Sequence, residues 1–174
     1  MRFLRTVRVR VLVAALCSVS IAALAAADEP PGLRVTGMTF VGSRGADSEL
    51  VVRAATAHFF PDSGMANLND VEVVVTDGED AANGKGFEMR CDDAELNVKT
   101  NDFTASGNVA GVTGNGQHYS TPWVRYEHEA ALLLTDASVV VVDQAGTFRG
   151  DGFRYFIEER RFQLLGNVSV EQAP

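Results

Sequence analysis

The amino-acid sequence predicts an all-β fold, an elongated roll built from stacked hairpins. Apolar and polar residues alternate on both sides of short polar turns, as they do in hairpins with one buried face. The same spacing recurs along the chain with a period of roughly 30 to 38 residues. No stretch after the first 27 residues has a convincing helical period. Among all-β sandwiches, barrels and rolls, equivalent stacked units favour a roll in which each unit extends one apolar interior.

The last repeat, residues 147–170, shows the pattern most clearly. Its outgoing strand carries the inward residues Phe148, Gly150, Phe153 and Tyr155. A charged tip, Glu158 to Arg161, reverses the chain. The return strand alternates through Phe162, Leu164, Gly166 and Val168. This predicts a hairpin whose apolar side chains share one face.

The same frame recurs three times upstream. One copy consists of Tyr119, Thr121, Val124, Tyr126, Leu133 and Val139. The copy before it consists of Met89, Cys91, Ala94, Leu96, Phe103 and Val109. A fainter first copy consists of Val52, Ala54, Ala57, Phe59 and Val71. In each copy three positions, not two, separate the small residue from the next apolar one, which predicts a bulge or bend there.

Residues 1–32 are predicted to precede the folded domain, residues 33–174. Residues 1–27 have a basic start and an apolar stretch, 11–27, that is at the short limit for a membrane span. The alanine-rich end before Asp28 offers cleavage sites, so a cleaved signal peptide and a retained anchor both fit. Either one exports the rest of the chain. Residues 28–32 form a linker, because Pro30 and Pro31 suit neither a helix interior nor a central strand.

The folded domain begins with Leu33 to Val41, which alternates well enough to form a first strand at the edge of the sheet. The first repeat spans Glu49 to Val75 and turns at Pro61 to Gly64. Asp77 to Gly86 is rich in turn-forming residues and is predicted to be an exposed loop. The other three repeats follow without a break to Val170, with Phe162 to Val170 as the final strand.

Charge and cysteine content exclude several classes of protein. Four of the 15 basic residues and none of the 23 acidic ones precede Asp28, so the exported part carries a net charge of −12. Such a domain is a poor nucleic-acid binder, because phosphate contacts require a basic face. Cys17 lies in the leader, so Cys91 has no partner for an internal disulfide. Cys91 fills the small-residue position of its repeat and is expected to be a packed thiol.

No group of residues predicts catalysis, a metal or a cofactor. We expect His58 and His118 to face outward and His128 to lie in an exposed turn between two glutamates. The sequence contains no nucleophile motif. Acidic residues of the loop, Asp77, Glu79 and Asp80, lack the spacing of a calcium-binding loop. The pairs Asp92-Asp93 and Glu158-Glu159 are typical of solvated strand ends. We therefore expect a protein that is not an enzyme.

The remaining candidate site is the interior of the roll. Its predicted lining residues are Val52, Phe59, Met89, Leu96, Phe103, Val109, Val124, Tyr126, Leu133, Val139, Phe148, Phe153, Tyr155, Phe162 and Leu164. Two interpretations fit these residues. They form either an ordinary packed core or a lumen that holds an apolar ligand, as larger β-architectures do.

From Arg34 to Glu171 the sequence resembles the periplasmic bridge proteins of lipopolysaccharide transport, the family of LptA, LptC and OstA N-terminal domains. The motifs that carry this resemblance are Arg53-Ala54-Ala55-Thr56-Ala57, Ala94-Glu95-Leu96, Ser106-Gly107-Asn108-Val109, Tyr119-Ser120-Thr121, Arg125-Tyr126, Gly150-Asp151-Gly152-Phe153 and Leu165-Gly166-Asn167-Val168. The alanine-rich early strand and the Gly-Asp-Gly-Phe motif are more similar to LptC than to LptA. The alanine run of the leader departs from LptC-like members, which usually keep an anchor.

The resemblance implies an elongated β-jellyroll that shields lipid acyl chains in its lumen. It implies a periplasmic protein, soluble or anchored by residues 11–27, that passes lipopolysaccharide from an inner-membrane ABC exporter toward the outer membrane. A bridge protein of the same fold would pair with the last strand at Gly166, Asn167, Val168, Ser169 and Val170, with the first strand facing the exporter. Two alternatives stay open: a soluble LptA-like bridge, and a structural β-repeat protein of the cell envelope that binds no lipid.

Overall fold

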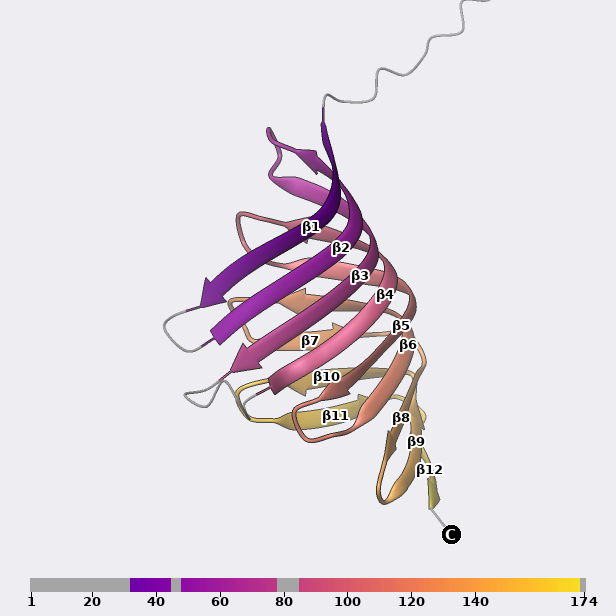
Figure 1. Ribbon diagram of the computed structural model, residues 1–174. Coiled ribbons are helices and arrows are strands. Elements are labelled where there is room, and N and C mark those ends of the chain that lie inside the picture. Colours follow the sequence, from indigo (N-terminus) through magenta and orange to yellow (C-terminus); the bar gives the residue numbers. More distant parts are fainter. Residues whose placement is uncertain (1–31, 45–47, 78–84, 173–174) are drawn as a thin grey trace, which may run out of the picture.

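A computed structural model describes residues 32–44, 48–77 and 85–172. Within these ranges the chain forms one antiparallel sheet of twelve strands and no helix (Figure 1). None of the described residues belongs to a helix long and apolar enough to cross a membrane. The strands are β1 (Leu33–Arg44), β2 (Ser48–Phe60), β3 (Met65–Asp77), β4 (Lys85–Asn97), β5 (Phe103–Thr113), β6 (His118–Glu127), β7 (Leu132–Thr135), β8 (Val139–Asp143), β9 (Gly146–Gly150), β10 (Gly152–Phe156), β11 (Arg161–Leu165) and β12 (Ser169–Gln172).

The sheet is folded lengthwise into two layers. β6 shows this directly, because Arg125 to Glu127 pair with β7 while His118 to Ser120 pair with β8. From there the two layers continue as separate short strands, β7, β10 and β11 in the first layer and β8, β9 and β12 in the second. β1 to β6 are long enough to cross from one layer to the other. β1 lies at one end of the roll and β12 at the other (Figure 1).

Each long strand bends where it passes between the layers. The pairing register shifts between Arg90 and Asp93 in β4 and between Ser106 and Val109 in β5. In the β2–β3 pair Ala55 and Asp70 are skipped, and Asp70 has a φ of +53°. The predicted bend after the small residue of each repeat is therefore confirmed. We call this line of bends the corner.

Two equivalent contacts hold the corner together. The Asn108 side-chain amide donates to Asp92 Oδ2 at 2.7 Å, and the Asn167 amide donates to Asp151 Oδ2 at 2.8 Å. The glycine before each asparagine has a positive φ, +74° at Gly107 and +78° at Gly166. A Cβ on Gly107 would lie 2.7 Å from Asp92 Oδ2, so both conformation and space require glycine. This explains the repeated Gly-Asn-Val motif as a close backbone approach.

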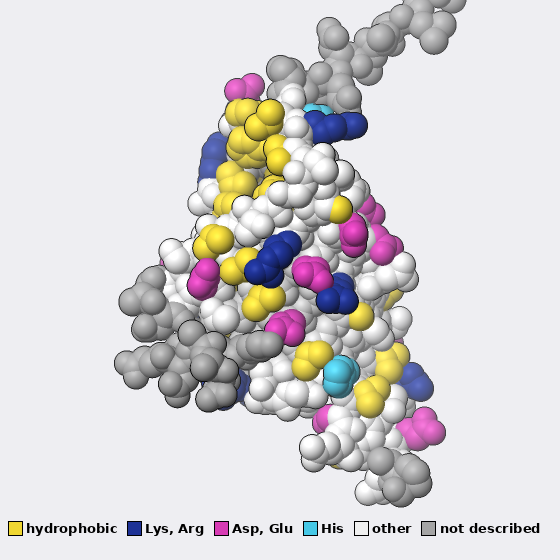
Figure 2. Space-filling model, in the orientation of Figure 1, with side chains coloured by type: hydrophobic (Ala, Val, Ile, Leu, Met, Phe, Trp, Pro, Cys, Tyr) yellow, Lys and Arg dark blue, Asp and Glu magenta, His cyan; other side chains and the backbone are white. Residues whose placement is uncertain are grey.

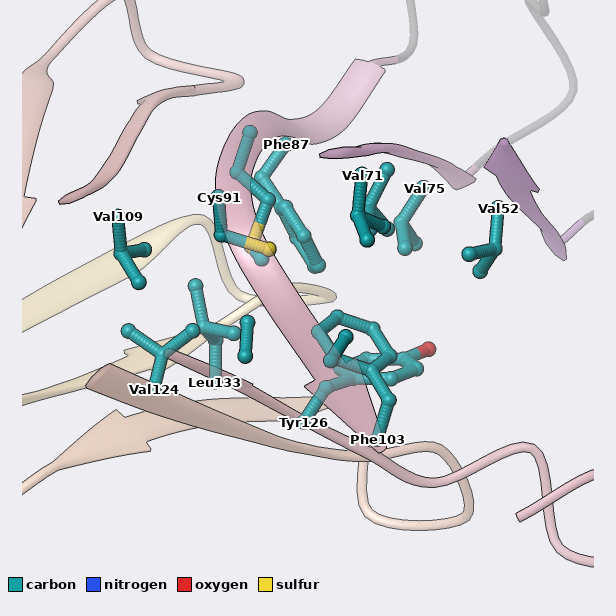
Figure 3. Close-up of a cluster of buried hydrophobic side chains, with 14 of the residues drawn as sticks. Val52, Val71, Val75, Phe87, Cys91, Phe103, Val109, Val124, Tyr126 and Leu133 are labelled. Atoms are coloured by element: carbon teal, nitrogen blue, oxygen red, sulfur yellow. The ribbon is translucent and has the colours of Figure 1, made fainter. Parts of the chain in front are cut away.

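Alternation places one face of strands β2 to β8 inside the roll, whereas all four residues of β12 are exposed. Buried positions in β2 and β3 are every second residue up to the bend, as the predicted period of two requires. Side chains from β2, β3, β4, β5, β6 and β7 point toward one another in a single cluster (Figure 3). Among the described residues this cluster packs between the two halves of the sheet.

The final strand differs from the prediction. The segment expected to run unbroken from Phe162 to Val170 is divided into β11 and β12. The corner lies between them, because Gly166 takes a positive φ and the chain must cross to the second layer. The leader, residues 1–27, most of the linker and the centre of the predicted loop Asp77 to Gly86 lie outside the described residues.

Candidate functional site

The structure brings all fifteen predicted lining residues to one apolar interior. Eleven of them are buried: Val52, Met89, Leu96, Phe103, Val109, Val124, Tyr126, Leu133, Val139, Phe153 and Tyr155. The other four are partly buried and pack against the same cluster: Phe59, Phe148, Phe162 and Leu164. Residues from every repeat therefore share one interior that runs the length of the roll.

Aromatic rings fill the centre of this interior. Tyr126 packs against Phe103 and Phe87 with ring centroids 5.2 and 5.6 Å away. Tyr119 and Phe162 both contact Phe153, at 5.4 and 4.8 Å. Tyr126 and Tyr155 are 0% exposed. The centre is thus tightly packed, with edge-on and stacked ring contacts that add to the area they bury.

Phe87 is an interior residue that sequence reasoning missed. Phe87 precedes Met89 and Cys91 at a spacing of two, so alternation could have identified it. Ile157, which the sequence pattern placed inside, lies in the tip between β10 and β11, next to Glu158. It is buried because it packs over Gly86, where an added Cβ would lie 2.7 Å from Ile157 Cγ2.

The interior opens at the C-terminal end of the roll. A pocket of about 190 Å³ lies there, lined by Gln117, Val141, Asp143, Phe148, Phe162 and Leu164. It is smaller than ordinary ligand sites, which measure about 300 to 1,000 Å³. Four of the six lining residues are apolar and two are polar, so the pocket suits one end of an alkyl chain.

The N-terminal end of the interior is also incompletely covered. Leu33 is 59% exposed, and Val35, Met38 and Phe59 are only partly buried against the core. Hydrophobic side chains gather at this end of the molecule (Figure 2). Because β1 pairs only with β2, its other edge leaves this end without a neighbour among the described residues. The interior is therefore closed in the middle and least covered at both ends.

All three tyrosines of the chain point into the interior, with different polar contacts. Tyr126 is joined to His128 Nδ1 by a hydrogen bond of 3.0 Å, and the Gly114 N–H donates to the Tyr155 hydroxyl at 3.3 Å. The hydroxyl of Tyr119 is buried with no hydrogen-bond partner among the described residues. Burial raises the pKa of Tyr119 well above its ordinary range, with Cys91 and Tyr155 adding to the shift.

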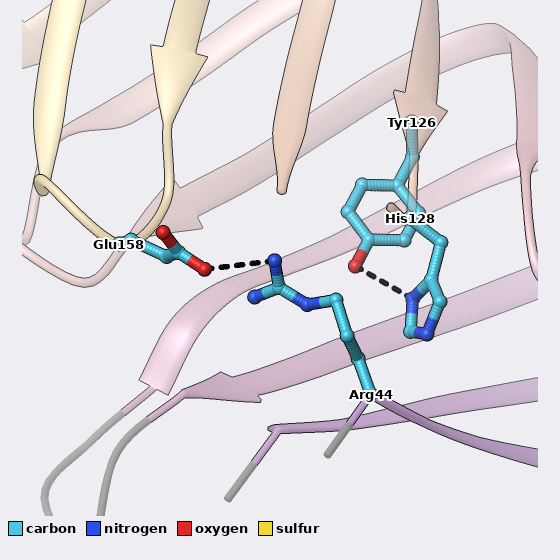
Figure 4. A network of polar contacts seen from close by, with 4 residues as sticks. All are labelled: Arg44, Tyr126, His128 and Glu158. Carbon is cyan, nitrogen blue, oxygen red and sulfur yellow. Dashed lines mark hydrogen bonds and ion pairs between the residues drawn. The ribbon is translucent and has the colours of Figure 1, made fainter. Parts of the chain in front are cut away.

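His128 was expected in an exposed turn, and this expectation is wrong. It is 4% exposed, with Nδ1 bonded to Tyr126 as Figure 4 shows. The backbone N–H of His128 donates to Asp102 Oδ1 at 2.8 Å, which draws its turn against the β4–β5 turn. His118 is exposed, as predicted, and His58 is intermediate. The three histidines come from separate parts of the roll.

Cys91 is a packed thiol, as expected, and not a reactive one. It is free and buried. Burial raises its pKa to about 11, and the carboxylates of Asp92 and Asp93 contribute to the shift. No group of three or more metal-ligating side chains occurs in the described part of the chain.

A larger hollow of about 630 Å³ lies on the outer face of the second layer. Charged and polar side chains such as Glu72, Arg90 and His118 line it together with outward-facing valines. Glu72 and Arg90 form an ion pair of 2.7 Å there. This mixed, open surface lies outside the interior, and the buried cluster remains the better candidate for an apolar ligand.

The predicted partner strand is exposed. Gly166 to Val168 form the corner, and Ser169 and Val170 begin β12, which pairs only with β9 among the described strands. Val170 is 61% exposed and Val168 is 49% exposed. β12 therefore has an unpaired edge at the end of the roll opposite β1.

Comparison with known proteins supports the fold. The chain resembles the crystal structure of LptH from Pseudomonas aeruginosa, the LptA-homologous periplasmic component of the conserved lipopolysaccharide transport device, with a TM-score of 0.56. The two chains are 15% identical over 72% of this chain and 95% of LptH. No protein-family profile matches the sequence, and no curated protein matches it. The protein thus has an LptA-like β-jellyroll fold.

Proposed function

We propose that this protein is a periplasmic component of lipopolysaccharide export that shields acyl chains in its interior. The observation that supports this most is one continuous apolar interior, built from all four repeats and least covered at its two ends. The LptA-like fold, shared with a protein of the transport device, supports the same assignment. The protein receives lipid from an inner-membrane exporter and passes it toward the outer membrane.

The hydrophobic effect supplies the reason for such a carrier. An acyl chain of about a dozen CH₂ groups costs on the order of 10 kcal/mol to expose to water, at ~0.8 kcal/mol per group. An apolar interior removes this cost, and transfer from one such interior to the next is nearly neutral. Direction must therefore come from an energy-consuming exporter. The acidic surface suits a lipid whose anionic head stays in solvent.

Within this proposal the protein acts at the exporter, in the manner of LptC. The motifs of the early alanine-rich strand and of Gly150 to Phe153 favour this role over that of a soluble LptA-like bridge. Residues 11–27 would anchor an LptC-like protein in the inner membrane, whereas cleavage before Asp28 would release it. Extraction of the membrane fraction with carbonate and sequencing of the mature N-terminus distinguish the two forms.

Photo-crosslinking tests the lumen. A photoreactive phenylalanine analogue at Tyr126 or Tyr155, which are inward, should capture lipopolysaccharide. The same analogue at the adjacent outward positions Arg125 or Arg154 should not. Phe162, at the open end, should label first when lipid is scarce. Equal labelling on both faces, or none on either, contradicts a lipid-binding lumen.

A structural β-repeat protein with a solid core is the second candidate, and the dense ring packing around Tyr126 favours it. Mass spectrometry of the protein purified under native conditions, before and after delipidation, separates the candidates. Co-purified lipid in stoichiometric amount supports the carrier. A lipid-free protein that takes up none on incubation with lipopolysaccharide supports the structural protein.

The free edge of β12 is proposed to pair with a bridge protein of the same fold, while β1 faces the exporter. Successive N–H groups of a strand point to opposite edges, so Ser169→Pro and Val170→Pro remove donors from different edges. The variant that removes a donor from the free edge should lose partner binding at unchanged stability. The variant that removes a donor from the edge paired with β9 should lose stability. If both variants bind the partner as the parent does, the junction lies elsewhere.

A further inference from the structure

The tip of the β10–β11 hairpin, residues 157–160, crosses from the first layer to the second. It lies on the side of the roll opposite the corner, which we call the seam (Figure 1). Arg44 Nη1, at the end of β1, lies 2.8 Å from Glu158 Oε1. The Asn115 side-chain amide donates to the carbonyl oxygen of Arg160. Together with Ile157 over Gly86, one tip thus contacts three elements of the second layer.

The Arg44–Glu158 pair links the first strand to the last hairpin across 114 positions of sequence (Figure 4). The Arg44 side chain is 19% exposed and that of Glu158 is 66% exposed, so the pair is partly shielded from solvent. The pairs Glu72–Arg90 and Glu159–Arg161 instead join residues within one layer. The position of the Arg44–Glu158 pair makes it a tie between the layers.

The geometry of the interior requires that some part of it opens before a chain can enter. Its centre is filled by rings that are not exposed at all, and the end pocket holds only part of a chain. A lipid with a large charged head cannot thread through the interior, because burying the head without partners is prohibitive. Sideways access through the seam leaves the head in water. Among the described strands β11 pairs only with β10, so the outer strand of this hairpin is held by a single ladder and can move without breaking a second one.

We propose that residues 157–160 form a clasp, that the Arg44–Glu158 ion pair holds it shut, and that an acyl chain enters sideways through the seam when it opens. The ligand part of this inference rests on the proposed function. The opening of the clasp itself can be measured on the protein without lipid.

Hydrogen-exchange mass spectrometry on the full chain tests the clasp. Glu158→Gln should speed amide exchange about two- to fivefold, both at residues 157–161 and at the end of β1 near Arg44, as loss of a partly exposed pair predicts. Exchange in β3 should stay unchanged, which shows intact global stability. The charge-swapped variant Arg44→Glu/Glu158→Arg should restore slow exchange.

Glu159→Gln is the matched control, because Glu159 contacts Arg161 in the same hairpin. Unchanged exchange in Glu158→Gln, or an equal effect of Glu159→Gln, overturns the clasp.

A second measurement separates the clasp from the lipid role. A fluorescent twelve-carbon fatty acid should associate faster with Glu158→Gln than with the parent, and at the parent rate with the charge-swapped variant. Faster exchange without faster association overturns the seam as the access route. If no variant binds the probe, the proposed lipid function and the access route fail together, while the exchange data still decide whether the clasp opens.

Discussion

The ring of Tyr119 lies against Gly111, its partner across the β5–β6 pair, on the inner face of the sheet. A Cβ at Gly111 would lie 2.6 Å from Tyr119 Cζ and Oη and would also meet the Glu88 carbonyl oxygen. Gly111→Ala should therefore destabilise the protein by about 1 to 3 kcal/mol through overpacking. Denaturant unfolding measures this. Ser120→Ala, on the outer face of the neighbouring position, is the control and should change stability little.

The Tyr119 and Tyr126 hydroxyls should differ in their effect on stability. Tyr126→Phe removes a bonded hydroxyl and leaves buried His128 Nδ1 without it, which should cost about 1 to 3 kcal/mol. Tyr119→Phe removes a buried hydroxyl that has no partner among the described residues, so stability should stay the same or rise by about 1 kcal/mol. Equal losses in thermal unfolding would mean that the Tyr119 hydroxyl is bonded.

Two variants separate how much the Asn108–Asp92 hydrogen bond and the backbone conformation of Asn108 each contribute to stability. Asn108 has a φ of +46°, and its amide bonds to Asp92. Asn108→Gly keeps the conformation and loses the bond, for a cost of about 1 kcal/mol. Asn108→Ala should cost about 1 to 2 kcal/mol more, because the left-handed region is unfavourable for alanine. Identical unfolding free energies for the two variants would contradict a conformational contribution.

Cys91 should make stability fall at alkaline pH. Its pKa rises from the ordinary 9.0 to about 11 on folding. The contribution of the protonated thiol to the free energy of unfolding is therefore complete below pH 9 and is lost as pH rises through 11. At 1.36 kcal/mol per unit, the loss between these values is about 2 to 3 kcal/mol. Cys91→Ala, the residue of the equivalent position Ala54, should show a correspondingly flatter decline. If stability falls equally with pH in the parent and in the variant from pH 9 to 11, the pKa of Cys91 is not raised by folding.

Local patterns of the sequence were sufficient to predict the strands, the repeat, the bends and which faces of the strands point inward. A strand has a period of two, so alternation alone predicted that Leu96, Phe103, Tyr126 and Tyr155 would share the interior. The three-residue step after Cys91 predicted the bend of β4, because an extra residue cannot keep the alternation without one. These features depend only on residues close together in the chain.

Contacts between distant residues decided the rest. His128 is buried in a turn that Asp102 of another hairpin holds, so its neighbouring glutamates were misleading. The final strand was expected to continue, yet a corner at Gly166 divides it because it must follow the fold of the whole sheet. The ion pair of Arg44 with Glu158 joins residues 114 positions apart. A pattern of neighbouring residues cannot predict a contact at that separation in the sequence. The sequence by itself determined which side chains face inward, and only the tertiary structure decided how the two layers close over them, because closure is set by turns that meet across the seam.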